Sequence, residues 1–517
     1  RDVERSRGLG DVYKRQPSDI KNKHYDKQKR WGFDETVRHF YNKDSEYDYD
    51  ELKPFDWIRG TQVGGRSLIW GKQTYRWSDL DFEANAKDGY GVDWPIRYKD
   101  IAPWYTHVEK FIGVSGEYLN LPHLPDSQFL PPMELNCVED HLKESINKNY
   151  RDRTLTIGRV AHITQGTKPG IGRGECQYRN RCGRGCPYGA YFSSNSSTIP
   201  VADSTGNLTL RSDSIVSEVI FDAKTQKATG VRVIDRLTKE VSEYKSKIIF
   251  LCASAIASSS ILMHSKSNRF PNGLGNDSGE LGHNIMDHQL GSGAGGTYDG
   301  FHDKYYTGRR PNGFYIPRFR NVNSNSSKVD FLRGYGYQGS ASRSYWSESV
   351  AELAYGGNFK ESIVKAGRWG IGMGGFGEVL PYHENKMMLN YNKLDQYGLP
   401  RIVLDAEFKE NEKKMKEDWK VQAAEMLEYA GCKDVKINDS NAPIGKGIHE
   451  MGTARMGRDP KTSVLNKFNQ IHAVKNVFVT DGSFMTSAAN QNPSLTYMAF
   501  TARAANHAVS ELKRMNL

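Results

Sequence analysis

Hydrophobic positions recur along the chain with a helical period in some stretches and with a strand-like alternation in others. A period of three to four residues predicts amphipathic helices at residues 98–111 and 411–431. A third helix is expected at residues 493–515, with one apolar face formed by Leu495, Met498, Ala502, Ala505, Val509 and Leu512.

Alternating or β-branched stretches predict the strands. Residues 207–222 and 228–235 are expected to pair around a turn at residues 224–226. Residues 247–265 predict a buried strand that enters a helix through small residues, and residues 476–483 predict a strand that ends at Asp481 and Gly482. Further strands are expected at residues 386–392 and 401–408.

Residues 291–440 differ in composition from the rest of the chain. They are rich in Gly, Tyr, Arg and Asn, and the final hundred residues return to the earlier pattern. A chain of 517 residues has room for two domains or one large discontinuous domain. We therefore expect a second domain at residues 291–440, inserted into a first domain.

Charge and composition exclude some classes of protein. The 71 Lys and Arg residues exceed the 61 Asp and Glu residues and give a net charge of +10, but they are scattered, so no nucleic-acid partner is expected. The most apolar run, residues 248–263, is interrupted by serines and is shorter than the ~20 residues of a membrane span. We therefore expect a globular enzyme without a transmembrane segment.

The opening residues 1–16 have neither the apolar core of a signal peptide nor a strand pattern. We expect them to be disordered or unrelated to the rest of the chain, and the true start of the protein to be missing.

Two segments near the end of the chain carry candidate chemistry. Asn492 and Pro493 favour a helix start, whose free N–H groups attract an anion such as a reduced flavin. His449 lies in a glycine-rich stretch, and a histidine there can take the proton of an alcohol while Asn492 holds the substrate oxygen. The alternative is that His449 is a structural histidine and Asn492 only a helix cap.

Six cysteines are too few for a disulfide scaffold, but three of them are clustered. Cys176, Cys182 and Cys186 lie among glycines and arginines with a C-x5-C-x3-C spacing. Three thiolates on one loop can hold an iron–sulfur cluster, whereas zinc lacks a fourth ligand nearby unless His162 supplies it. The alternative is a set of free or paired thiols in a surface loop.

Several segments resemble, in order, the signature segments of the glucose-methanol-choline (GMC) oxidoreductases, which are flavoenzymes that oxidise alcohols and sugars. They are "VGGRSLIWG", "LCASAIASSSILM", "GELGHNIMDH", "HEMGTARMGRDPKTSVLN" and "NVFVTDGSFMTSAANQNPSLTYMAFTARAA". The resemblance covers roughly residues 30–517. It implies an α/β flavoprotein with a discontinuous, Rossmann-like FAD-binding domain at residues 17–290 and 441–517. The segment at residues 291–440 would be an α+β substrate domain built on an antiparallel sheet.

The same resemblance implies roles for individual residues. His449 would be the catalytic base, with Asn492 as its partner at the flavin. Val216 would meet the adenine through its backbone. The other residues implied along the FAD are Gly64, Gly65, Ser67, Asp481, Gly482, Asn492 and Pro493.

Two departures from the family pattern matter. Family members begin with a strand, a G-x-G-x-x-G turn and a helix that hold the pyrophosphate, whereas the "GLG" at residues 8–10 lacks the third glycine and the flanking pattern. We therefore expect an N-terminally incomplete chain that lacks this βαβ turn. In pyranose-oxidase-like members a histidine links covalently to the flavin; Ile69 stands at that position, so we expect a non-covalent FAD.

The cysteine spacing is similar to that in bacterial GMC dehydrogenases for glucose and for the C3 position of glycosides. There three cysteines ligate a 3Fe–4S cluster, and the enzyme works with a small partner subunit and a cytochrome c. The resemblance therefore implies a sugar or glycoside dehydrogenase with the same cluster and similar partners. The rival functions are an oxygen-using pyranose or alcohol oxidase and a non-catalytic binding or assembly protein.

Overall fold

The computed structural model describes residues 35–44, 46–179, 182, 185–304, 312–343 and 367–517. Residues 1–16, expected to be unrelated or disordered, lie outside the described residues. Among the described residues, no helix is both long and apolar enough to cross a membrane. The described chain mixes helices with several separate sheets, so the α/β class is confirmed.

A seven-stranded antiparallel sheet is the largest sheet of the described chain. Its strands follow the order β16-β10-β13-β12-β11-β3, and β9 also pairs with β13. The bounds are β3 (Thr156–Ile157), β9 (His288–Gln289), β10 (Gly293–Tyr298), β11 (Phe314–Ile316), β12 (Tyr335–Arg343), β13 (Trp369–Glu378) and β16 (Lys433–Asn438). The sheet takes β3 and β9 from outside residues 291–440.

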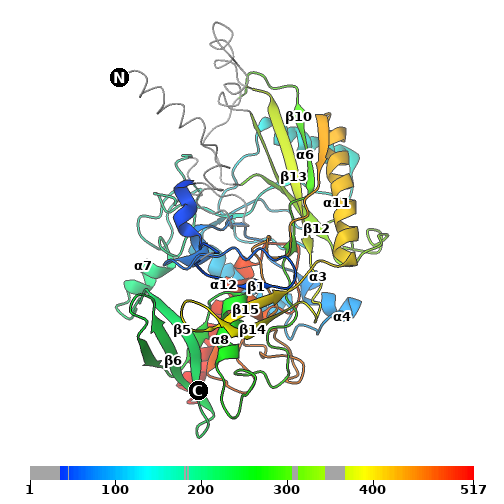
Figure 1. Cartoon of the computed structure of the whole chain (residues 1–517). Coiled ribbons are helices and arrows are strands. Elements are labelled where there is room, and N and C mark those ends of the chain that lie inside the picture. Colours follow the sequence, from blue (N-terminus) through cyan, green and yellow to red (C-terminus); the bar gives the residue numbers. More distant parts are fainter. Residues whose placement is uncertain (1–34, 45, 180–181, 183–184, 305–311, 344–366) are drawn as a thin grey trace, which may run out of the picture.

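Two helices pack on this sheet, as Figure 1 shows for α11 alongside β10 and β13. They are α6 (Cys137–Asn149) and α11 (Glu410–Tyr429). In α11, Met415, Trp419, Ala423 and Met426 recur every three or four residues and are fully buried, which places one stripe of the helix against the sheet. This packing forms a core of its own.

The larger core lies around the C-terminal helix α12 (Ser494–Lys513), which packs against α5 (Tyr98–Ile112). Two short parallel strands, β8 (Ile249–Leu251) and β17 (Val477–Val479), pair beside it, and β8 leads into α8 (Ala255–His264). The antiparallel strands β5 (Ser214–Asp222), β6 (Lys227–Asp235) and β7 (Val241–Lys245) lie next to α8 and away from α11 (Figure 1).

The remaining elements are short or lie between these cores. A further three-stranded sheet joins β1 (Asp50–Glu51), β15 (Pro400–Asp405) and β14 (Lys386–Leu394), and a small pair joins β2 (Val114–Ser115) and β4 (Val160–Ala161). The other helical turns are η1 (Glu35–Phe40), η2 (Gly65–Leu68), α3 (Asp79–Phe82), α4 (Ala84–Asp88), α7 (Thr198–Asp203) and η4 (Gly482–Phe484). The division of the chain into two domains stays a prediction.

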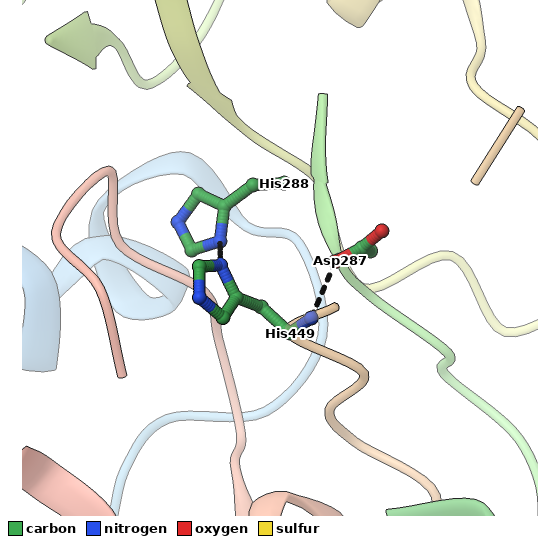
Figure 2. Close-up of side chains that lie close together, drawn as sticks. All are labelled: Asp287, His288 and His449. Carbon is green, nitrogen blue, oxygen red and sulfur yellow. Dashed lines mark hydrogen bonds between the residues drawn. The ribbon is translucent and has the colours of Figure 1, made fainter. Parts of the chain in front are cut away.

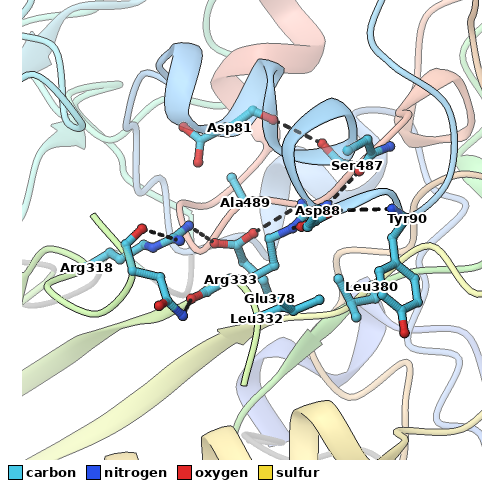
Figure 3. Close-up of polar contacts among 12 residues, drawn as sticks. Asp81, Asp88, Tyr90, Arg318, Leu332, Arg333, Glu378, Leu380, Ser487 and Ala489 are labelled. Carbon is cyan, nitrogen blue, oxygen red and sulfur yellow. Dashed lines mark hydrogen bonds and ion pairs between the residues drawn. The ribbon is translucent and has the colours of Figure 1, made fainter. Parts of the chain in front are cut away.

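A buried charge network joins the antiparallel sheet to α4 (Figure 3). Glu378, at the end of β13, accepts a hydrogen bond of 2.7 Å from Arg318 and lies 3.7 Å from Arg333. Arg333 also binds Asp88 and donates to Asn85 Oδ1 at 2.7 Å. Burial and the neighbouring Glu378 raise the pKa of Asp81, close to this network, to about 7. Protonation of Asp81 reduces the excess of carboxylates over guanidinium groups in and around this network.

The helix at residues 493–515 is confirmed, but its predicted details are wrong in two respects. The buried positions are Leu495, Thr496, Ala499, Phe500, Ala504 and Ala508, while Ala505, Val509 and Leu512 are exposed. Small alanines face inward because they let the helix approach Phe478 of β17 closely. The helix begins at Ser494, and Asn492 forms no side-chain cap, because its amide oxygen accepts a hydrogen bond from Gln338.

Candidate active site

One buried carboxylate shapes the loop that carries His449. Asp287 accepts hydrogen bonds from the backbone N–H groups of Gly445 at 2.8 Å, Gly447 at 2.9 Å and His449 at 2.9 Å. A Cβ at Gly447 would lie 2.4 Å from the Asp287 carboxylate, so only glycine allows this approach. Ile448 adopts the left-handed region at φ 60°, which the surrounding hydrogen bonds hold in place.

The His449 ring contacts two other side chains. Its Nδ1 lies 2.9 Å from Nδ1 of His288, and Figure 2 shows the two rings meeting edge to face. Its Nε2 lies 3.5 Å from the amide nitrogen of Asn492. Burial, His288 and Arg66 hold the pKa of His449 well below its usual value. The imidazole is therefore neutral at pH 7 and able to accept a proton.

Asn492 is oriented by the antiparallel sheet. Gln338 on β12 donates a hydrogen bond of 2.6 Å from its amide nitrogen to Asn492 Oδ1. The amide nitrogen of Asn492 then faces His449, and the two residues that the sequence singled out, 43 positions apart, lie side by side. Gln338 itself was not predicted, because no local pattern marks it.

An ion pair ties the segment at residues 64–72 to the His449 loop. Arg66 binds the buried carboxylate of Glu450 at 2.7 Å and the carbonyl of Ile448 at 3.4 Å. Gly64 and Gly65, predicted along a cofactor, adopt left-handed backbone angles at the start of η2. Ser67 donates to the carbonyl of Gly64 at 2.6 Å and accepts from the amide of Ser194 at 3.0 Å.

Asp481 and Gly482 lie where the parallel strands β8 and β17 end. Thr480 and Cys252, which come directly after the two strands, are 3.2 Å apart at their side chains. Asp481 is buried, accepts from Ser258 and Ser483, and burial raises the pKa of its carboxyl group. The crevice outside the carboxyl ends of parallel strands is where α/β proteins bind their ligands.

Val216 and Pro493 stand at two further predicted positions. Val216 lies on β5, which is linked to the end of α8 by a hydrogen bond of 2.8 Å from Val219 N–H to Ser265. Pro493 immediately precedes α12, next to Asn492.

The three clustered cysteines are half-buried on one loop, and none forms a disulfide. The loop is anchored by backbone bonds from Cys176 to Ile163 and from Gly174 to Tyr188. Burial raises the pKa of the Cys182 thiol to about 11. His162, the alternative fourth ligand, is buried, and its Nδ1 has no hydrogen-bond partner among the described residues.

Lys72 lies against this loop with only 2% of its surface exposed. Among the described residues its ammonium group has no hydrogen bond or ion pair, and it sits 4.3 Å from the Tyr191 ring centre. Burial lowers the pKa of Lys72 to about 7, and the nearby Cys182 and Cys186 partly oppose that shift. A buried cation with so little compensation favours an anion in its neighbourhood.

One group of three potential metal ligands is found within the described chain, namely Asp287, His288 and His449. Their candidate ligand atoms all lie within 4.8 Å of one another. Tetrahedral zinc with bonds of about 2.0–2.1 Å would place two nitrogens about 3.3 Å apart. The 2.9 Å between the two Nδ1 atoms is that of a hydrogen bond, and Asp287 is engaged by backbone amides. Hydrogen bonding accounts for this set.

Sequence reasoning did not assign roles to Asp287, His288, Arg66 or Lys72. The segment that contains Asp287 and His288 resembles a family signature, so a signal exists for those two. Arg66 and Lys72 flank the predicted cofactor residues but have no pattern of their own.

Comparison with known proteins identifies the family. GMC oxidoreductase patterns match residues 51–290 in their N-terminal part and residues 381–501 in their C-terminal part. The chain is 27% identical to 2-methyl-1,2-propanediol dehydrogenase of Mycolicibacterium austroafricanum, covering 93% of this chain and 86% of the relative. It is 24% identical to the fructose dehydrogenase large subunit of Gluconobacter japonicus, covering 87% and 81%.

Solved structures share the fold. Pyridoxine 4-oxidase from Mesorbium loti aligns with a TM-score of 0.56 at 15% identity, over 87% of this chain and 84% of that one. Formate oxidase from Aspergillus oryzae RIB40 aligns with a TM-score of 0.57 at 13% identity, over 92% of both chains. With both family patterns matched in order and this fold, the chain belongs to the GMC oxidoreductase family.

Proposed function

We propose that this protein is an FAD-dependent dehydrogenase that oxidises a CH–OH group of a sugar or glycoside, with His449 as the base. The observation that carries the proposal is the pairing of a neutral, half-buried His449 with Asn492 at 3.5 Å. Relatives named as dehydrogenases of a diol and of fructose support an alcohol or sugar substrate.

The two side chains divide the work on the substrate hydroxyl. His449 Nε2 accepts the hydroxyl proton, and the Asn492 amide donates to the substrate oxygen and holds its C–H bond in place. Gln338 keeps that amide turned toward the site. Because the low pKa of His449 keeps its base form, the proton acceptor persists down to pH values well below 6.5.

The residues around His449 fit a non-covalent FAD. Asp481 and Gly482 come after β17 at the carboxyl end of the parallel pair, and Gly64 and Gly65 bring backbone close to the same region through Arg66. The α12 N-terminus adds a partial positive charge that favours a reduced, anionic ring. When bound, FAD supplies the hydride acceptor at N5.

Cys176, Cys182 and Cys186 are proposed to hold a 3Fe–4S cluster. The three cysteines are half-buried and free of disulfides, so their thiols are available as ligands. The buried Lys72 ammonium beside Cys182 and Cys186 suits an anionic group on this loop. When bound, the cluster would pass electrons singly to an external acceptor.

The names of two relatives support the proposal that this chain works with partner proteins. These are named as a fructose dehydrogenase large subunit and a gluconate 2-dehydrogenase flavoprotein. The first name implies a further subunit for that protein. We extend this to a small partner subunit and a cytochrome c for the present chain.

The test is the rate of flavin reduction by substrate in a His449→Ala variant. Removing the base is expected to slow reduction at least about 100-fold, the lower end of what a positioned base contributes, while flavin binding persists. His383→Ala, at a side chain that is 60% exposed, is the matched control. In the wild type the rate should stay constant from pH 8 to 6.5 and fall only at more acid pH. An undiminished rate in His449→Ala would contradict the assignment.

A further inference from the structure

His288 is buried on β9, and both nitrogens of its ring are engaged. Its Nε2 is hydrogen-bonded to the backbone carbonyl oxygen of Ala489, and its Nδ1 lies 2.9 Å from Nδ1 of His449. A carbonyl oxygen can only accept, so Nε2 of His288 must carry the hydrogen.

The protonation of one ring then dictates that of the other. Burial lowers the pKa of His288 to about 4, so this ring is neutral at pH 7 and has a single N–H, at Nε2. Its Nδ1 is therefore an acceptor. The facing Nδ1 of His449 must donate, and since His449 is also neutral, its Nε2 keeps the lone pair.

The lone pair on Nε2 of His449 is directed toward the proposed substrate position beside Asn492. Nε2 of His449 faces the Asn492 amide nitrogen, which can only donate and so tolerates an acceptor opposite it. In the other tautomer of His449, two N–H groups would oppose each other at Asn492, and two lone pairs would oppose each other at His288. The carbonyl of Ala489 thus specifies the state of His449 through one intervening ring.

We propose that His288 is a positioning residue that selects the Nδ1–H tautomer of His449 and so leaves Nε2 free to take the substrate proton. The inference rests on the proposed role of His449 as base. Asp287 fixes the backbone of the same loop, whereas His288 fixes the proton on the ring. The adjacent residues 287 and 288 therefore hold the base in two independent ways.

Two variants of the flavin-loaded enzyme separate this role from a merely structural one. His288→Phe keeps the bulk of the ring but offers no acceptor to His449. His288→Gln keeps an amide that can accept from His449 and donate to Ala489. We expect the limiting rate of flavin reduction to fall about 100-fold in His288→Phe, the lower end of the contribution of a base, and to recover at least tenfold in His288→Gln.

Substrate binding should be unchanged in both variants, because neither side chain contacts the proposed substrate position. The dissociation constant from the concentration dependence of reduction is therefore the second readout, and flavin content with the thermal midpoint confirms folding. A folded His288→Phe enzyme with the wild-type rate, or a His288→Gln enzyme as slow as His288→Phe, would overturn the proposal. A fast His449→Ala enzyme would instead remove the proposed function itself.

Discussion

At the scale of single residues, the buried ammonium group of Lys72 is the most informative feature of the cysteine loop. Lys72 is buried beside Cys182 and Cys186, and its ammonium meets only the face of Tyr191 among the described residues. A neutral environment would not retain this cation at low cost. Its position beside Cys182 and Cys186 supports the proposal that this loop holds an anionic cluster.

Replacing Lys72 by methionine tests this interpretation. If an iron–sulfur cluster occupies the loop, Lys72→Met should retain iron but lower the reduction potential of the cluster, because a nearby positive charge stabilises the more negative reduced state. Potentiometric titration with EPR detection measures the shift, and Lys87→Met, at an exposed lysine, is the control. An unchanged potential would remove Lys72 from this role, and wild-type protein purified anaerobically without iron would remove the cluster.

Sequence analysis proposes roles for some of these residues and passes over others for a physical reason. His449 and Asn492 stand in motifs whose local composition is distinctive, with glycines around one and proline after the other. Gln338 and Lys72 act through contacts with residues distant in sequence, such as Asn492, 154 positions from Gln338. Nothing near them in the sequence records that contact.

At the scale of elements, a stripe of glycines lets α11 lie close to β13. A Cβ built on Gly375 would lie 2.7 Å from the Trp419 ring, and one on Gly377 would lie 2.5 Å from it. Trp419 is fully buried, so the ring has no room to withdraw. The glycines of this strand thus serve packing and not a turn.

Gly377→Ala is expected to destabilise the protein by about 1–3 kcal/mol, as overpacking of a core does. The matched control is Gly370→Ala on the same strand, where the nearest atom to an added Cβ is 3.9 Å away. Urea unfolding of both variants gives the comparison. Equal stability losses would show that strand propensity, and not the Trp419 contact, governs the effect.

Periodicity located the long elements, including α5, α8, α11 and the β5–β6 pair. It failed on the inward face of α12, because alanines occur on several sides of this helix and their weak hydrophobic signal does not distinguish one face from another. Two-residue strands such as β3 and β9 are too short to show any period, although β9 holds His288.

At the scale of the whole molecule, the charge network of Figure 3 links the segments that build the two cores. Arg318, Arg333 and Glu378 come from the antiparallel sheet and its connections, while Asp88 and Asn85 come from α4. Asn85 also donates to the carbonyl of Thr486, in the loop that leads to Asn492. The network therefore connects the sheet to the loop of the proposed site.

Arg333→Met should lower the free energy of unfolding by about 3–5 kcal/mol, since it leaves buried carboxylates short of a partner. Lys414→Met removes an exposed pair with Asp330 and should cost less than about 1 kcal/mol. Chemical denaturation at pH 7 compares the two variants. A loss below about 1 kcal/mol in Arg333→Met would mean that the network is not a structural link.

The overall architecture was accessible from the sequence because several family segments occur in order along the chain. The connections between the segments were not. Asp81, Glu378 and their neighbours meet only after the sheet and the α3–α4 region have formed, so their altered pKa values result from the assembled core.

The segment at residues 64–72 touches both proposed centres. Arg66 forms an ion pair with Glu450, next to His449. Ser67 is hydrogen-bonded to Ser194, which follows the cysteine loop, and the carbonyl of Gly71 accepts a hydrogen bond from Tyr191. Engineering either centre for a new donor or acceptor would consequently disturb the other if it altered this stretch. Laboratory evolution that spares this segment can vary the two chemistries separately.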